Sequence, residues 1–171
     1  MAHAQEGTHN NPTARGLSQQ FGLSSPSFAD GDRIPRRHTA DGENVSPRLT
    51  WSKPPAGAES LALVCEDPDA PRGTFVHWLA WNLPVEQREL AEAASPNRGG
   101  ARLLQEGQNG FGQEGYGGPS PPPGKPHRYV FRLFALDERL ELPARASRAE
   151  FDRAIEAHVL GEATLIGVYG R

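Results

Sequence analysis

Short runs in which apolar and polar residues alternate recur along the chain, and glycine or proline separates them. Alternation with a period of two is typical of strands that bury one face, and Gly and Pro mark the turns between strands. The pattern predicts seven strands, at residues 21–24, 49–51, 61–65, 74–83, 102–105, 128–136 and 164–169. It therefore favours an all-β fold, a two-sheet antiparallel β-sandwich with one or two short peripheral helices.

One segment, residues 147–160, has a helical pattern. Ser147 is followed three positions later by Glu150, which is the signature of a capping box at a helix N-terminus. Phe151, Ile155 and Val159 then recur on one face of the predicted helix. We expect this helix to lie on the sandwich and to lead into the last strand.

The composition bounds the class of protein. The chain has 171 residues, of which 36% are hydrophobic, enough for one sizeable core. We expect a disordered polar N-terminus over residues 1–16 and one domain over residues 17–171. The net charge of −3 comes from interspersed charges, without the basic stripe that nucleic acid or an anionic membrane requires.

The chain shows no signal-peptide core and no stretch of membrane-spanning length. Its one cysteine, Cys65, ends an apolar run, cannot form an intrachain disulfide, and fits a small core residue in a reducing compartment. These features predict a cytoplasmic protein with no stable membrane insertion and no nucleic-acid partner.

A cluster of polar residues precedes an apolar strand in "CEDPDAPRGTFVHWLAWNLP", residues 65–84. Asp67 and Asp69 lie in the turn, and His77 is the only ionisable side chain on the strand. Strict alternation places the side chains of Phe75, His77, Leu79, Trp81 and Leu83 on one face of this strand. Read alone, the aspartates are ordinary turn residues and His77 is a hydrogen-bonded core histidine.

A second polar cluster follows the Gly/Pro-rich loop in residues 107–137. Alternation puts His127, Tyr129, Phe131 and Leu133 on one face of the strand that follows this loop. Glycines let backbone N–H groups approach an anion closely. Together the two clusters predict a small polar pocket with apolar walls.

Four motifs in this order resemble the phosphatidylethanolamine-binding protein family, in particular its bacterial branch of YbhB/YbcL-type Raf-kinase-inhibitor-like proteins. They are "LSSPSFADGDRIPRRHTADGENVSPRLTW", "DPDAP…FVHWLAWNLP", "YGGPSPPPGKPHRYVFRLFALD" and "HVLGEATLIGVYGR", and the resemblance covers residues 21–171. It implies a two-sheet antiparallel β-sandwich whose ligand pocket is formed by the DPDAP turn, the histidine before the tryptophan, and the Gly-Pro loop with its HRY strand. It assigns pocket roles to Asp67, Asp69, Pro71, His77, Gly118, Pro119, His127 and Tyr129. The stretch "GGPSPPPG" fits the loop in more than one register, which leaves the positions of Gly118 and Pro119 open.

The chain departs from the family pattern in two places. It has Ala40 where many relatives have a cysteine, a change expected to affect only local packing. It ends at Arg171, whereas eukaryotic members continue into a C-terminal helix beside the pocket. The resemblance therefore implies a more open pocket or one closed by a second subunit, and we expect a homodimer; the eukaryotic kinase-inhibitory role is not implied.

The predicted function is a binding protein that holds a small anion, such as a phosphate or a phospholipid head group, on protonated imidazoles, with a regulatory role left open. We expect the two aspartates to raise the pKa of the imidazoles. Two alternatives remain open: an inhibitor of a protease or kinase that acts through the pocket rim, with an unknown protein partner, and, less favoured, an Asp/His acid–base hydrolase.

Three further expectations concern chemistry and packing. The sequence has no G-x-S-x-G elbow or other activated nucleophile, so we expect no enzyme activity. It has no ligand spacing such as H-x-x-x-H, so we expect no metal and no cofactor. Phe75, Trp78 and Trp81 are interpreted as core residues, and the Arg/Glu alternation of residues 137–153 is interpreted as a solvated surface.

Overall fold

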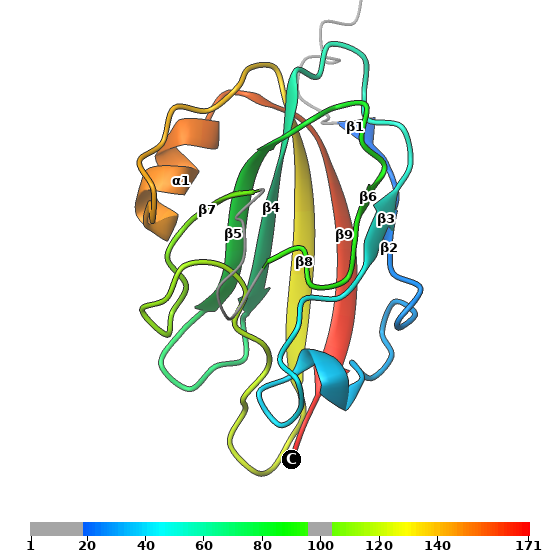
Figure 1. The fold of residues 1–171 in the computed structure, drawn as a ribbon, viewed down its shortest axis with the longest axis vertical. Helices are drawn as coiled ribbons and strands as arrows, with labels where there is room; N and C mark the ends of the chain where they lie inside the picture. Colours follow the sequence, from blue (N-terminus) through cyan, green and yellow to red (C-terminus); the bar gives the residue numbers. More distant parts are fainter. Residues whose placement is uncertain (1–18, 96–103) are drawn as a thin grey trace, which may run out of the picture.

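Two stacked β-sheets make up most of the computed structural model, which describes residues 19–95 and 104–171 (Figure 1). The larger sheet has the strand order β1-β9-β8-β4-β5-β7, and the smaller has the order β2-β3-β6. The strands are β1 (Gln19–Gln20), β2 (Leu23–Ser24), β3 (Leu49–Trp51), β4 (Ser60–Asp67), β5 (Phe75–Leu83), β6 (Glu89–Leu90), β7 (Gln105–Glu106), β8 (His127–Leu136) and β9 (Val159–Tyr169). All neighbouring strands are antiparallel except β1 and β9, which are parallel. The predicted antiparallel β-sandwich is confirmed.

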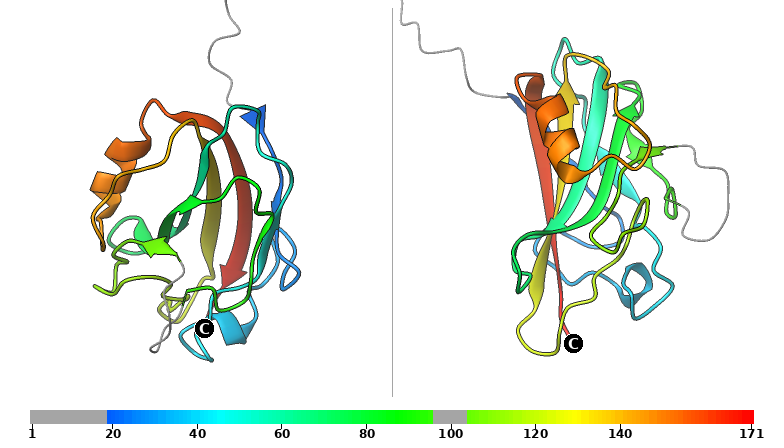
Figure 2. Two further views of the ribbon diagram at one scale, coloured as in Figure 1. Left: turned by 45° about the horizontal axis from the view of Figure 1, so that its top comes forward. Right: turned by 90° about the vertical axis from the view of Figure 1, so that its left-hand side faces the viewer.

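Each face of the larger sheet buries its own apolar cluster. The inner face packs against the smaller sheet, and its cluster includes Cys65, Trp78 and Phe131. The outer face packs against helix α1 (Arg148–Ile155), which contributes Phe151 and Ile155. Figure 2 shows α1 and the smaller sheet on opposite sides of the larger one. Because both faces are covered, all eight residues of β4 are buried, including the apolar run of residues 61–65.

The helix prediction is right at its start and wrong at its end. Ser147 and Glu150 form the predicted capping box. The helix ends at Ile155, because Glu156 is the C-cap and Ala157 has a left-handed φ of 67°. Val159 therefore begins β9, well before the predicted start of that strand. A second short helix, a 3₁₀ turn, spans Arg36–His38.

The prediction that the alternate residues from Phe75 to Leu83 all share one face of β5 is wrong, because a β-bulge interrupts the strand. In the pairing of β4 with β5, Cys65 lies opposite Trp78, and the next residue, Glu66, lies opposite Val76. His77 is thus an extra residue of β5 that has no paired residue on β4. Bulges re-aim side chains and are common next to functional sites. As a result, Trp78 packs between the sheets, whereas Leu79 and Trp81 pack beneath α1.

Some sequence expectations concern residues outside the described ranges. The expected disordered N-terminus falls in residues 1–18, and part of the predicted strand at residues 102–105 falls in residues 96–103. Within the described residues, none of the helices has the length and apolar character needed to cross a bilayer.

Candidate functional site

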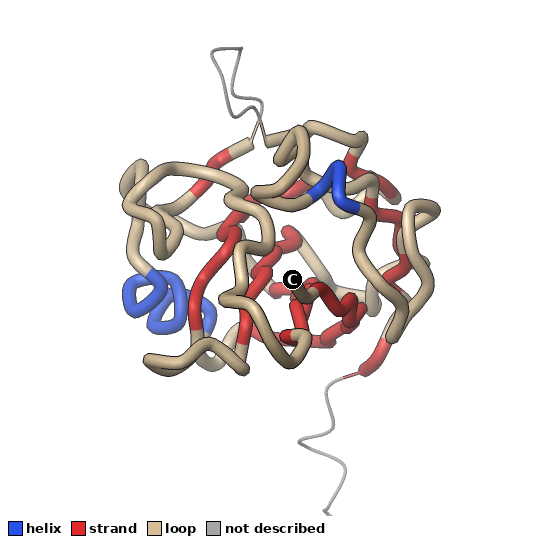
Figure 3. The backbone as a smooth tube through the Cα atoms, turned by 90° about the horizontal axis from the view of Figure 1, so that it is seen from below, coloured by secondary structure: helices blue, strands red, loops and turns tan. Residues whose placement is uncertain are grey.

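A small pocket lies at the end of the sandwich where β4 ends and where β5 and β8 begin. Figure 3 views this end from below, where loops surround the strand ends near the C-terminus. The pocket has a volume of about 130 Å³. Its lining residues are Asp67, Ala70, Pro71, Phe75, His77, Phe111, Ser120, Pro121, Pro122, His127 and Tyr129. The structure thus brings together five of the eight site residues predicted from the sequence: Asp67, Pro71, His77, His127 and Tyr129.

A buried carboxylate–imidazole pair lies at the base of the pocket. Asp67 ends β4 and His127 begins β8, and these two strands are antiparallel neighbours. His127 Nδ1 lies 2.7 Å from Asp67 Oδ2, with 8% of His127 and 4% of Asp67 exposed. Since a carboxylate accepts, Nδ1 carries the proton. Nε2 of His127 is left to interact with a ligand, as an acceptor when the ring is neutral and as a donor when it is protonated.

His77 is held by the loop that follows β7. Its Nδ1 donates to the carbonyl of Gly117 at 2.6 Å, and the Gly117 N–H donates back to the His77 carbonyl at 2.9 Å. Burial lowers the pKa of His77 and outweighs the opposite effect of the Gly117 carbonyl and of Asp67. Asp67 thus acts on His77 in the expected direction, but burial outweighs it and the net pKa shift is downward. The ring is neutral at pH 7, with Nε2 as an acceptor.

Tyr129 contributes a hydroxyl without a hydrogen-bond partner. The residue is only 1% exposed, and its Oη has no partner in the described structure. Burial and the nearby Asp67 carboxylate raise the pKa of the phenol, so the hydroxyl stays protonated. An unpaired buried hydroxyl costs about 1–3 kcal/mol. Tyr129 therefore lines the pocket with a protonated hydroxyl that is itself buried and has no partner among the described residues.

Asp69 faces away from the pocket, although the sequence predicts that it belongs there. Its carboxylate accepts from the backbone N–H, Nε and Nη2 of Arg128, at 2.9, 3.0 and 2.9 Å. These bonds lower the pKa of Asp69 to about 2. Its own N–H donates to Asp67 Oδ1 at 2.8 Å. Asp69 thus ties the turn to β8 and fixes Asp67 without lining the pocket.

Gly118 and Pro119 also lie behind the pocket wall. A Cβ on Gly118 would lie 2.5 Å from the His38 carbonyl oxygen, so only glycine fits this close approach. Its N–H donates to Asn44 Oδ1 at 2.8 Å, and the Pro119 carbonyl accepts from the Ala40 N–H at 2.9 Å. These bonds anchor the segment that supplies the wall, which is formed by the next three residues, 120–122.

An ion pair supports this wall from outside. Arg171 binds the Asp41 carboxylate through Nε and Nη2, with the shortest contact at 2.7 Å. The same guanidinium donates to the Pro121 carbonyl at 3.0 Å and to Ser120 Oγ at 3.2 Å. The Tyr169 hydroxyl donates to Asp41 at 2.6 Å. Arg171 and Tyr169 together lower the pKa of Asp41 to about 2.

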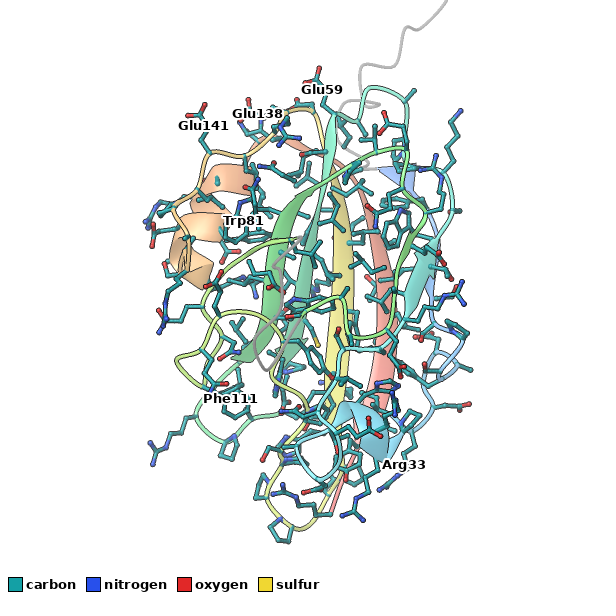
Figure 4. The ribbon with its side chains drawn as sticks, viewed as in Figure 1. Arg33, Glu59, Trp81, Phe111, Glu138 and Glu141 are labelled. Atoms are coloured by element: carbon teal, nitrogen blue, oxygen red, sulfur yellow. The ribbon has the colours of Figure 1, made fainter. Side chains whose placement is uncertain are left out.

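Sequence reasoning missed six lining residues: Ala70, Phe75, Phe111, Ser120, Pro121 and Pro122. Phe75 was assigned to the core, and it instead forms an aromatic wall with Phe111, whose ring centroid is 4.8 Å away. Phe111 is 45% exposed and is the one exposed large hydrophobic residue within the described ranges (Figure 4). A phenylalanine alone in a glycine-rich loop was the available signal. The described residues include no group of three His, Cys, Asp or Glu side chains suited to a metal ion.

Comparison with known proteins shows to which family this fold belongs. Residues 24–170 match the sequence profile described as phosphatidylethanolamine-binding protein. The chain belongs to the phosphatidylethanolamine-binding protein family. The crystal structure of YbcL from Escherichia coli, described as a new member of the mammalian family, superposes with a TM-score of 0.83 at 32% identity, over 90% of this chain and 99% of that one.

Sequence relatives in this family come from archaea and bacteria. The chain is 49% identical over 152 residues to a UPF0098 protein of Methanothermobacter thermautotrophicus, covering 87% of this chain and 98% of the relative. It is 37% identical over 158 residues to UPF0098 protein YbhB of Escherichia coli, covering 86% and 98%. The predicted YbhB/YbcL-type resemblance is confirmed.

The ligand, the homodimer and the cytoplasmic location stay predictions. The name of one relative bears on the compartment: LppC of Mycobacterium tuberculosis, 40% identical over 148 residues and covering 86% of this chain and 71% of the relative, has lipoprotein in its name.

Proposed function

We propose that this family member is a binding protein that holds a small phosphate-bearing or other anionic group in the pocket formed by His77, His127 and Tyr129. The observation that carries the proposal is the buried Asp67–His127 pair, which lines the pocket and leaves Nε2 of His127 without a hydrogen bond to any described residue. Protonation of His127 turns Nε2 into a donor and adds a positive charge beside Asp67. A bound anion would stabilise that protonated form.

The pocket walls support recognition of a small group. A volume of about 130 Å³ is below the roughly 300–1,000 Å³ of pockets for drug-sized ligands, which favours a small group such as a head group. Phe75, Phe111 and the three lining prolines, Pro71, Pro121 and Pro122, give the pocket apolar walls. Charge interactions are stronger in such surroundings than in bulk water.

We also propose that the protein does not act as a hydrolase. Ser120 lines the pocket, but its Oγ accepts a hydrogen bond from Arg171, and no imidazole of the described residues is hydrogen-bonded to it. Cys65 is buried in β4, where burial raises the pKa of its thiol. A serine or cysteine nucleophile needs an adjacent base or a lowered pKa. Turnover of p-nitrophenyl phosphate or acetate that disappears in a His77→Ala variant would contradict this proposal.

Calorimetric titration with inorganic phosphate and with phosphoethanolamine tests the proposed binding. We expect tighter binding at pH 6 than at pH 8, because imidazoles change charge within this range. A His127→Ala variant should bind more weakly, with a flatter pH dependence. Arg153→Ala is the matched control, because Arg153 is exposed on α1 and outside the pocket. Affinity that is independent of pH, or unchanged in His127→Ala, would overturn the proposal.

A further inference from the structure

The pocket contains an atom that can only accept a hydrogen bond. His77 Nδ1 lies 2.6 Å from the carbonyl oxygen of Gly117. A carbonyl oxygen has no proton to donate, so the shared proton is on Nδ1. In the neutral ring Nε2 then has a lone pair and no hydrogen.

Nε2 of His77 is available to a ligand. The residue is 3% exposed and lines the pocket, and no described residue bonds Nε2. The described chain has three side-chain atoms that are both fully buried and without a partner, and Nε2 of His77 is not one of them. Because Nε2 has no partner, it must belong to the small exposed part of His77. The groups around the ring are Phe75, Phe111 and Tyr129, with ring centroids 4.9, 5.6 and 5.2 Å away.

Burial, and not the surrounding charge, keeps the His77 ring neutral. Asp67 and His127 are the charged or titratable partners that act on it electrostatically, and they act in opposite directions. Burial dominates and lowers the pKa of His77. Near pH 7.5 Nε2 is therefore an acceptor, close to the Asp67 carboxylate, which also only accepts.

We propose that the group bound in this pocket must itself donate a hydrogen bond to His77 Nε2, so that the site selects phosphate over sulfate. This inference rests on the proposed function and deepens it. Both species of inorganic phosphate near neutral pH carry at least one P–OH, whereas sulfate has the same tetrahedral shape and no proton. An ammonium group, as in phosphoethanolamine, meets the same requirement.

The physical basis of the selection is an unpaired lone pair. Bound sulfate would place an oxygen against Nε2, so that two acceptors face each other in a site with little water. A buried acceptor left without a partner is costly, and the expected discrimination corresponds to about 5- to 150-fold in affinity.

The test is a calorimetric comparison of three probes at pH 7.5: inorganic phosphate, sulfate and monofluorophosphate. Monofluorophosphate is a dianion in which fluorine replaces the hydroxyl of phosphate, so it tests the proton without changing the size. We expect phosphate to bind about 5- to 150-fold more tightly than either of the other two. In His77→Phe, which removes the acceptor and keeps a planar ring, the ratio should fall to about 2-fold or less.

His158→Gln is the matched control. It removes an imidazole that lies outside the pocket and contacts Asp137 and Glu138, so the ratio should not change. If His77→Phe does not fold, ¹⁵N spectra of the wild type provide an independent measurement, because they report which ring nitrogen of His77 is protonated. Equal affinity for the three probes, or a proton on Nε2, would overturn the inference and leave the proposed function intact. No binding of phosphate at either pH 6 or pH 7.5 would overturn both.

Discussion

Asp67 and Asp69 are two positions apart in one turn, yet Asp67 binds the imidazole of His127 inside the pocket and Asp69 binds the guanidinium of Arg128 outside it. The two carboxylates therefore have separable roles. We expect Asp67→Asn to weaken phosphate binding at pH 6 by at least about 5-fold, because His127 loses the carboxylate that accepts from its Nδ1–H and orients the ring.

Asp69→Asn is the control for that prediction. The Asp69–Arg128 pair is half-exposed, and such pairs contribute about 0–1 kcal/mol to stability. Phosphate affinity should change by less than about 2-fold, and the melting temperature should fall only slightly. Calorimetry and thermal denaturation of both variants would show it; equal losses of affinity would mean that the turn acts as one unit.

The stability of the protein should depend on the ionisation of His77. Burial lowers its pKa in the folded state, whereas in the unfolded chain a histidine titrates near ~6.5. Below that pH the unfolded state binds more protons than the native state, so the free energy of unfolding falls as the pH drops from about 6.5 through the folded pKa.

Urea denaturation at pH 7.5 and pH 5.5 measures this effect. We expect the wild type to lose stability over this interval and His77→Phe to lose less. Asp41 and Asp69, with pKa values of about 2, do not contribute in this window, because their stabilisation is lost only at pH values below about 4. The same pH dependence in the wild type and in His77→Phe would show that the loss comes from other groups.

Arg171 should act on ligand affinity through the pocket wall. It binds Asp41 with two nitrogens and also holds Ser120 and Pro121, a geometry that a lysine ammonium cannot reproduce. We expect Arg171→Lys to weaken phosphate binding by about 2- to 10-fold with little change in melting temperature. Calorimetry would check it, and an affinity equal to that of the wild type would mean that the proline segment holds its position without the guanidinium.

Much of the sandwich was predictable because a strand that buries one face alternates apolar and polar residues in the sequence. The strands with the longest apolar runs, β4, β5 and β8, were located to within a few residues. Where the pattern gave a wrong helix end or a wrong strand face, the local backbone conformation explains the difference. The left-handed φ of Ala157 ends α1, although Val159 continues the helical spacing. The bulge at His77 breaks the alternation of β5, and no residue type in the sequence predicts this bulge.

The candidate site was predictable only in part, because a motif shows which residues are present and not where they point. Asp69 has the chemistry of a pocket residue, but the N–H and side chain of Arg128 turn its carboxylate outward. Similarly, Arg148 falls in an alternation typical of a solvated surface, and yet its guanidinium reaches across to Glu66 on β4 and only 27% of its side chain is exposed. In both cases, partners that are distant in sequence determine where the side chain points.

The strand order of the larger sheet has a consequence for how the pocket forms during folding. Asp67 and His127 meet only when β4 pairs with β8, and the wall over them is fixed by Arg171, which follows β9. The chain must therefore close several long loops before any ligand contact exists, and topologies rich in such non-local pairings fold slowly, on the order of milliseconds to seconds. Since the pocket is absent until these pairings are complete, a ligand stabilises only the finished fold. Its binding would report on the whole domain and not on any fragment of it.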